Sequence, residues 1–134
     1  PVVNSMATFR SFVDIDAWQK ARELTGLVYA ATRANAFSKD FGLRDQARRA
    51  AVSIMANMQR GYGRSGSEFL QFLAVAKGSA CEVISHVYVA LDQGYIDRQE
   101  FERLNELAER TLYLVGGLMK YLQQSNIKGA KYKR

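Results

Sequence analysis

Arginines are the residues of this sequence best suited to chemistry, and the chemistry is the binding of phosphate groups. Arg44 and Arg48 lie one helical turn apart, and Arg60 and Arg64 flank a glycine-containing segment beside Tyr62. Cations next to an aromatic ring at a turn can hold phosphates and stack a base, so these four arginines are candidate nucleic-acid contacts. The alternative is an ordinary solvated helix face.

A second group of cations lies at the end of the chain. Residues 126–134 contain four basic residues, no acidic residue and one tyrosine, and this composition predicts an arm that contacts nucleic acid. The alternative is a tail that only keeps the protein soluble. The four cations are Lys128, Lys131, Lys133 and Arg134.

Charge is spread unevenly along the chain, whose net charge is +6. Residues 39–79 carry 7 basic and 3 acidic side chains, residues 80–109 carry 2 and 7, and residues 110–134 carry 6 and none. Alternating basic and acidic blocks favour an anionic partner or charge-directed self-association.

Residue types that catalyse reactions or bind metals are sparse. The spacing Gly61-x-Gly63-x-x-Gly66 resembles a dinucleotide-binding loop, but it follows a predicted helix, so we interpret it as an interhelical turn. His86 is the only histidine, and a bundle site for two metals needs a second one. Cys81 is alone in an apolar context and is expected to be a buried, reduced thiol. We therefore predict no catalytic residues, no metal and no cofactor.

Apolar residues recur three and four positions apart, which predicts helices. The chain has 134 residues, 48% of them hydrophobic, and its only proline is residue 1, so one domain of long helices is expected. The first helix starts near Asp14 or Asp16 and ends near Asn35, and the others span about 40–60, 65–93 and 97–125. Expected capping boxes begin at Asp16, Ser65 and Asp97.

Short connections between these helices predict an all-α, antiparallel up-down-up-down four-helix bundle. We divide the chain into a flexible segment at 1–11, the bundle at 12–125 and a basic tail at 126–134. No signal peptide is visible and no run approaches about 20 apolar residues. A cytoplasmic protein with no membrane partner is therefore expected.

The fourth predicted helix is more apolar than one core stripe requires. Leu107, Leu114 and Tyr121 form a second row at seven-residue spacing, which we interpret as an interface between subunits. Close approach of another helix would explain the pair Gly116-Gly117 in the helix interior. The alternative is a single broad core face.

Several stretches resemble one known family. Residues 46–64 resemble the pattern Q-x-R-R-A-x-x-S-I-x-x-N-I-A-E-G-x-G-R, residues 69–82 the pattern F-x-x-F-L-x-x-A-x-G-S-x-x-E, and residues 91–96 the pattern L-x-x-G-Y-I; residues 16–21 resemble the family's opening helix. The family comprises four-helix bundle proteins encoded in intervening sequences of bacterial 23S rRNA genes. Arg60 stands where the family usually has Glu, and Met55 where it often has Pro, so roles of that carboxylate do not carry over.

This resemblance implies a small cytoplasmic bundle that assembles into a ring, expected to be a homopentamer. It also implies kinship with the basic, nucleic-acid-binding accessory protein of diversity-generating retroelements. No catalytic activity is established for the family. The predicted function is thus a non-enzymatic homo-oligomer that binds RNA or other nucleic acid. The alternative is a protein-interaction or scaffolding ring without nucleic-acid binding.

Overall fold

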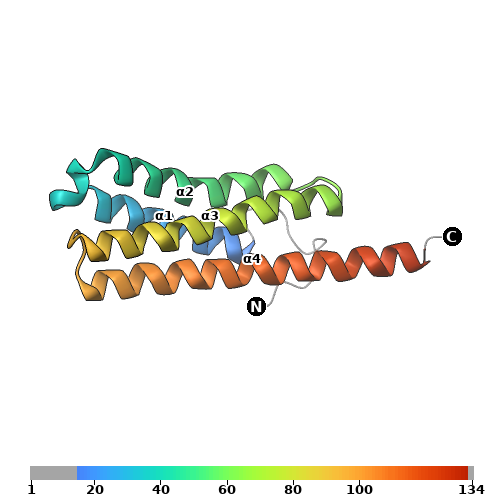
Figure 1. Cartoon of the computed structure of the whole chain (residues 1–134). Helices are drawn as coiled ribbons and strands as arrows, with labels where there is room; N and C mark the ends of the chain where they lie inside the picture. The colour runs from blue at the N-terminus through green and yellow to red at the C-terminus, as the bar shows by residue number, and fades with distance from the viewer. Residues whose placement is uncertain (1–14, 133–134) are drawn as a thin grey trace.

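The computed structural model describes residues 15–132, and side chains up to residue 125, as a bundle of four long helices (Figure 1). No strand occurs among residues 15–132, so the all-α prediction is confirmed. The helices, with one short 3₁₀ helix, are α1 (Asp16–Thr32), η3 (Asn35–Lys39), α2 (Phe41–Gly61), α3 (Gly66–Asp92) and α4 (Arg98–Tyr132).

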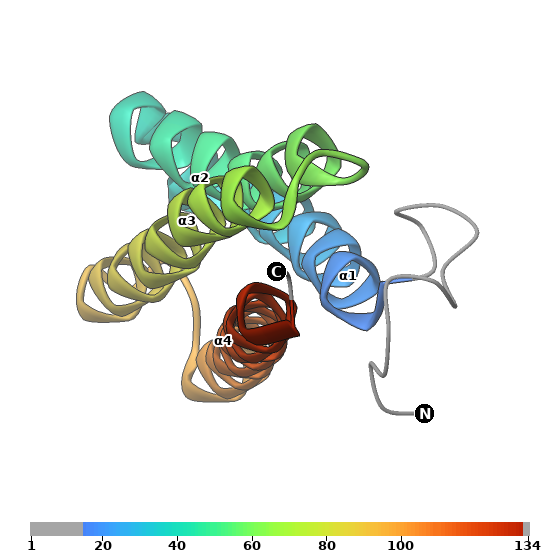
Figure 2. The same ribbon diagram turned by 90° about the vertical axis from the view of Figure 1, so that its right-hand side faces the viewer.

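Each helix packs against two others. The contacts join α1 to α2, α2 to α3, α3 to α4 and α4 back to α1. Viewed along the bundle, the four helices therefore enclose one core, with the α2–α3 face opposite the α1–α4 face (Figure 2). The α1–α2 and α3–α4 connections lie at one end of the bundle and the α2–α3 turn lies towards the other (Figure 1).

The core consists of the residues that the periodicity selects. All seven expected core positions of α4 are buried, and α2 and α3 bury most of theirs. Burial of a large apolar side chain stabilises the fold by about 1.5–3 kcal/mol, so these stripes define which way each helix faces. The α4 positions are Phe101, Leu104, Ala108, Thr111, Val115, Leu118 and Leu122.

Of the three predicted capping boxes, the one at Asp97 forms completely and the one at Ser65 forms in part. The Glu100 amide donates to Asp97 Oδ1 at 2.8 Å and the Asp97 amide donates to Glu100 Oε1 at 3.2 Å. At the start of α3, the Glu68 amide donates to Ser65 Oγ at 3.3 Å, but Glu68 Oε1 accepts from the Ser65 hydroxyl at 3.1 Å and not from the Ser65 amide. The box at Asp16 is wrong, because the N-cap of α1 is Ile15, whose side chain makes no capping hydrogen bond. Ile15 is fully buried, so core packing positions this end of α1.

The glycines of the α2–α3 turn have separate roles. Gly63 has a φ of +85°, which side chains with a Cβ rarely adopt. Gly61 is buried in the last turn of α2, and a Cβ there would lie 2.6 Å from Phe69 Cδ1 and 3.0 Å from Phe72 Cβ. The turn therefore needs left-handed backbone at residue 63 and close contact between α2 and α3 at residue 61.

The predicted interface row of α4 lies at the edge of the core. Leu107, Leu114 and Tyr121 are each half-buried and pack against the core of their own chain. A Cβ on Gly116 or Gly117 would meet nothing within 4 Å, so no contact with another described part of the chain explains that pair. The subunit interface remains a prediction.

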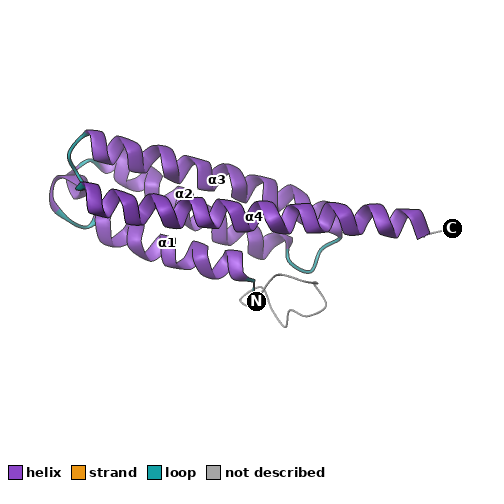
Figure 3. Ribbon diagram, turned by 90° about the horizontal axis from the view of Figure 1, so that it is seen from below, coloured by secondary structure: helices purple, strands orange, loops and turns teal. Residues whose placement is uncertain are grey.

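The backbone of α4 continues as helix to Tyr132, past the boundary at residue 125 expected from the sequence. Figure 3 shows α4 extending beyond the ends of the other three helices. The expected roles of segment 1–11 and of the side chains of Lys128, Lys131, Lys133 and Arg134 lie outside the described residues.

Cys81 is exposed, so the prediction of a buried thiol is wrong. Its neighbours Ala80 and Val83 belong to the buried stripe of α3, and Cys81 is turned by about 100° from Ala80 towards solvent. By length and composition alone, α3 is apolar enough to cross a membrane, but core helices of soluble proteins pass the same test. It is the one such helix in the described part of the chain.

Candidate nucleic-acid interface

Arg44 lies in the first turn of α2, and its guanidinium contacts neighbouring groups of the same chain. Its Nε donates to Asp45 Oδ1 at 2.9 Å, a terminal nitrogen donates to the Ser38 carbonyl oxygen at 3.1 Å, and the group lies 4.8 Å from the centre of the Phe41 ring. These contacts partly neutralise Arg44. They leave the residue near the α1–α2 connection, at one end of the bundle.

The Arg48 side chain packs against α1. Its Nε donates to Thr32 Oγ1 at 2.8 Å, and its guanidinium lies 4.6 Å from the centre of the Tyr29 ring. The side chain is half-buried, and it satisfies the fully buried Thr32 hydroxyl at the end of α1. Arg48 thus has a structural role that the spacing of the arginines did not predict.

Arg60 and Arg64 lie together at the other end of α2, about 24 Å from Arg44 at 1.5 Å per residue. Arg64 Nε donates to the Arg60 carbonyl oxygen at 2.7 Å, and an Arg64 terminal nitrogen lies 3.5 Å from Glu68 Oε2. The Arg60 side chain is exposed and takes part in no ion pair of the described residues. The four predicted arginines therefore form two separate groups.

A polar groove between α2 and α3 brings together residues that the site prediction did not include. Its volume is about 300 Å³. Arg49 and Glu82 are both exposed at it, and neither takes part in a hydrogen bond or ion pair of the described residues. Arg49 was not among the predicted nucleic-acid contacts, although its spacing from Arg60 (eleven residues, three helical turns) places both on one side of α2. The lining residues are Gln46, Arg49, Ala50, Ser53, Ser79 and Glu82.

Hydrogen bonds fix the floor of this groove. Ser79 Oγ donates to Ser53 Oγ at 2.9 Å, which joins α3 to α2. Asn57 Nδ2 donates to the Ser53 carbonyl oxygen at 2.9 Å and to Ser53 Oγ at 3.0 Å. Ser79 and Asn57 are buried, so these hydrogen bonds form a preorganised polar cluster beneath the exposed residues. Arg49, Glu82 and Gln46, which are exposed at the groove, can hydrogen-bond a ligand.

The groove residues come from two of the stretches that carry the family resemblance. Gln46, Arg49 and Ser53 belong to residues 46–64, and Ser79 and Glu82 belong to residues 69–82. Packing of α2 against α3 therefore places polar positions of both patterns on one surface.

His86 lies one turn beyond Glu82 on α3 and is half-buried. Its Nε2 is buried and has no hydrogen-bond partner in the described structure. Residues 15–125 contain no group of three or more His, Cys, Asp or Glu side chains able to hold a metal ion.

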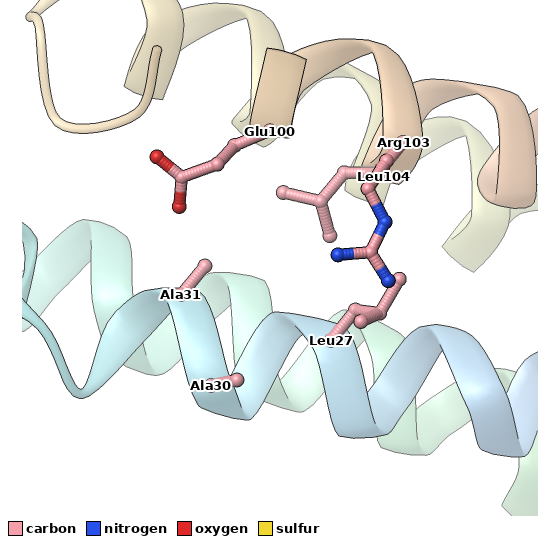
Figure 4. Close-up of a pocket in the computed structure, with 6 residues that line it drawn as sticks. All are labelled: Leu27, Ala30, Ala31, Glu100, Arg103 and Leu104. Atoms are coloured by element: carbon pink, nitrogen blue, oxygen red, sulfur yellow. The ribbon is translucent and has the colours of Figure 1, made fainter.

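A second depression lies on the opposite face, between α1 and α4. Figure 4 shows Glu100 and Arg103 of α4 reaching over Leu27 and Ala31 of α1. A larger hollow of about 700 Å³ continues from there, with Lys20, Glu23 and Arg110 among its lining residues. Acidic and basic groups alternate around it, so it has no predominantly positive surface for a polyanion.

Comparison with known proteins identifies the family of this chain. Residues 13–117 match the family described as 23S rRNA-intervening sequence protein. The chain belongs to this family. The match spans α1, α2, α3 and more than half of α4, so the resemblance of the separate stretches extends over the bundle.

Membership of the 23S rRNA-intervening sequence protein family agrees with the fold of a solved structure. That structure, at 1.70 Å resolution, is of a protein of unknown function from the S23 ribosomal protein family of Bacteroides thetaiotaomicron. The two proteins share 23% sequence identity and a TM-score of 0.71, with 78% of this chain and 98% of that chain covered. At this identity the likeness establishes the fold alone. A search of curated proteins finds no match.

Proposed function

We propose that this chain is a non-enzymatic, homo-oligomeric nucleic-acid-binding protein whose natural ligand is RNA. The observation that carries the proposal is the group of cations on the α2–α3 face. Arg60 is exposed and has no acidic partner among the described residues, Arg64 lies at the adjoining turn, and Arg49 is exposed on the same side of α2. Unpaired guanidinium groups on one face attract phosphates and release counterions from RNA on binding. The proposed setting is the bacterial cytoplasm.

The oligomer we propose is a ring, expected by family resemblance to be a homopentamer of antiparallel up-down-up-down bundles. The open space above Gly116 and Gly117 supports an interface on α4, because another helix could approach the backbone there. Leu107, Leu114 and Tyr121 lie on the same helix and are only half-buried by their own chain.

Binding to single-stranded RNA fragments at two salt concentrations tests the proposal. We expect retention at low salt and a steep loss of affinity as salt rises. The double variant Arg60→Ala/Arg64→Ala should bind less tightly and show a shallower salt dependence. Its matched control is Arg103→Ala/Arg110→Ala, which removes the same charge from the opposite face. Absence of RNA retention at low salt, or equal losses in the two double variants, would contradict the proposal.

The second candidate is a scaffolding ring without nucleic-acid affinity, supported by the half-buried apolar row on α4. It predicts an oligomer by light scattering, dissociation when Leu114 or Tyr121 is replaced by Glu, and no salt-dependent RNA retention. Both candidates require an assembly, so a solution mass equal to one chain would exclude both.

A further inference from the structure

The groove between α2 and α3 has a lining that a simple anion would not fit. Arg49 would attract a phosphate, but the Glu82 carboxylate at the same groove would repel it. A complementary ligand must therefore offer hydrogen-bond acceptors to a guanidinium and hydrogen-bond donors to a carboxylate. It must also be small, because about 300 Å³ is at the lower limit for ligand sites.

We propose that this groove binds one unpaired guanine base of an RNA strand, with Arg49 and Glu82 as the groups that recognise it. The inference rests on the proposed RNA-binding function and adds the ligand of one site. Guanine carries two neighbouring acceptors, O6 and N7, that match the fork of an arginine. It also carries two neighbouring donors, N1–H and the N2 amino group, that match both oxygens of a carboxylate. Among the four RNA bases, guanine alone offers both pairs.

The surroundings of the two residues suit this assignment. The hydrogen bond from Ser79 Oγ to Ser53 Oγ joins α3 to α2 beside the groove, and Asn57 holds Ser53 in place. The Gln46 amide lies at the same groove and adds both a donor and an acceptor. Sequence-specific proteins read RNA in this way, by hydrogen bonds to the edges of unstacked bases. Arg60 and Arg64, nearer the end of the same face, would hold the adjoining phosphates.

Oligouridine strands with a single changed nucleotide at the centre test the inference. The central nucleotide is guanosine, adenosine, inosine (which lacks the N2 amino group) or 7-deazaguanosine (which lacks N7), and affinity is measured by fluorescence anisotropy at fixed salt. We expect guanosine to bind about tenfold more tightly than adenosine, with inosine and 7-deazaguanosine between them.

The variant Glu82→Ala should bind guanosine and inosine strands equally, since the partner of the N2 amino group is gone. Arg49→Ala should likewise abolish the difference between guanosine and 7-deazaguanosine. Both positions are exposed on helices that tolerate alanine, so folding should persist. Glu106→Ala is the charge-matched control because Glu106 lines the opposite hollow, and it should keep the full guanosine preference.

The outcomes separate this inference from the function on which it rests. Binding of plain oligouridine without any preference for guanosine overturns the guanine site and leaves RNA binding intact. Absence of all RNA binding removes both. A change in the assembly mass of Glu82→Ala, with its guanosine preference unchanged, overturns the inference and assigns the groove to contacts between copies of the chain.

Discussion

Arg48 donates a hydrogen bond from Nε to Thr32 Oγ1 at 2.8 Å, and this contact ties the first half of α2 to the last turn of α1. Thr32 Oγ1 in turn donates to the Val28 carbonyl oxygen at 2.7 Å. One guanidinium thus satisfies a hydroxyl that is fully removed from solvent.

Replacement of Arg48 by Ala should therefore lower stability more than it lowers RNA affinity. A hydrogen bond to a charged donor contributes about 1.5–3 kcal/mol, and contact with the Tyr29 ring adds to it. We expect the free energy of unfolding to fall by about 1.5–3 kcal/mol, as measured by urea denaturation. Arg22→Ala, at an exposed position of α1, serves as the control with unchanged stability. Equal stability of the two variants would show that the contact has no structural role.

Gly61→Ala should destabilise the junction of α2 and α3. The new methyl group would lie 2.6 Å from Phe69 Cδ1 and 3.3 Å from Phe69 Cα, and part of that contact is with backbone, which cannot rotate away. Overpacking of this kind costs about 1–3 kcal/mol. Thermal unfolding of Gly61→Ala and wild type gives the comparison, and an unchanged melting temperature would contradict the close packing.

Gly117→Ala, in contrast, should stabilise the isolated chain. Apart from the adjoining turns of α4 itself, no atom of the described residues lies within 4 Å of the new Cβ, and alanine favours helix over glycine by about 1 kcal/mol. The bundle itself should gain stability. If another subunit packs closely at this point of α4, the same variant should lower the assembly mass measured by light scattering. An unchanged assembly would place the interface elsewhere.

The hydrogen bond between Tyr95 and Asp40 should make the stability of the fold decrease at high pH. Its hydroxyl donates to Asp40 Oδ2 at 2.9 Å. This hydrogen bond, then burial, then the Asp40 charge raise the pKa of Tyr95 above its ordinary value of 10.0. The folded state keeps the phenol proton to higher pH than the unfolded state. Its stabilising contribution is therefore complete below pH 10 and is lost as pH rises through the raised pKa.

Urea denaturation between pH 8 and pH 11 measures this loss. The difference in unfolding free energy between wild type and Tyr95→Phe should be largest at the lower pH and should shrink as pH rises. A difference that stays constant across the range would mean that Asp40 does not hold the tyrosine proton.

Cys81 should react with a thiol reagent in the native protein. The side chain is exposed on α3, so access does not require unfolding. Ellman's reagent should modify one thiol per chain in native buffer at the rate seen in urea, within a few-fold. Protection that disappears only on dissociation of the assembly would instead place the outer face of α3 at a subunit contact.

The sequence predicts the parts of this fold that depend on local periodicity. The α4 stripe from Phe101 to Leu122 and the capping box of Asp97 with Glu100 require only spacing along one helix. The cap expected at Asp16 was wrong and the contact of Arg48 with α1 was not predicted, because both depend on tertiary packing. A buried Ile15 replaces the expected cap, and the partner of Arg48 lies on α1, 16 residues away.

The candidate site was less predictable for the same reason. Arg49 and Glu82 are 33 positions apart in sequence, and only the packing of α2 against α3 brings them to one groove. Arg60 and Arg64 could be selected because they flank a glycine turn visible in the sequence. The spacing of Arg49, Ser53, Ala56 and Arg60 along one side of α2 was a signal that could have added Arg49.

Asp40 serves two neighbours at once: Oδ1 accepts from the Leu43 amide at 3.1 Å, and Oδ2 accepts from Tyr95. The Asp40 carboxylate thereby links the α1–α2 connection to the α3–α4 connection at one end of the bundle. The other end has the α2–α3 turn around Gly63. The two ends of the bundle should consequently open at different rates. Backbone amide protons around Ser65 should exchange with deuterium sooner than those around Asp40. Replacement of Asp40 by Asn should remove this difference in exchange rate.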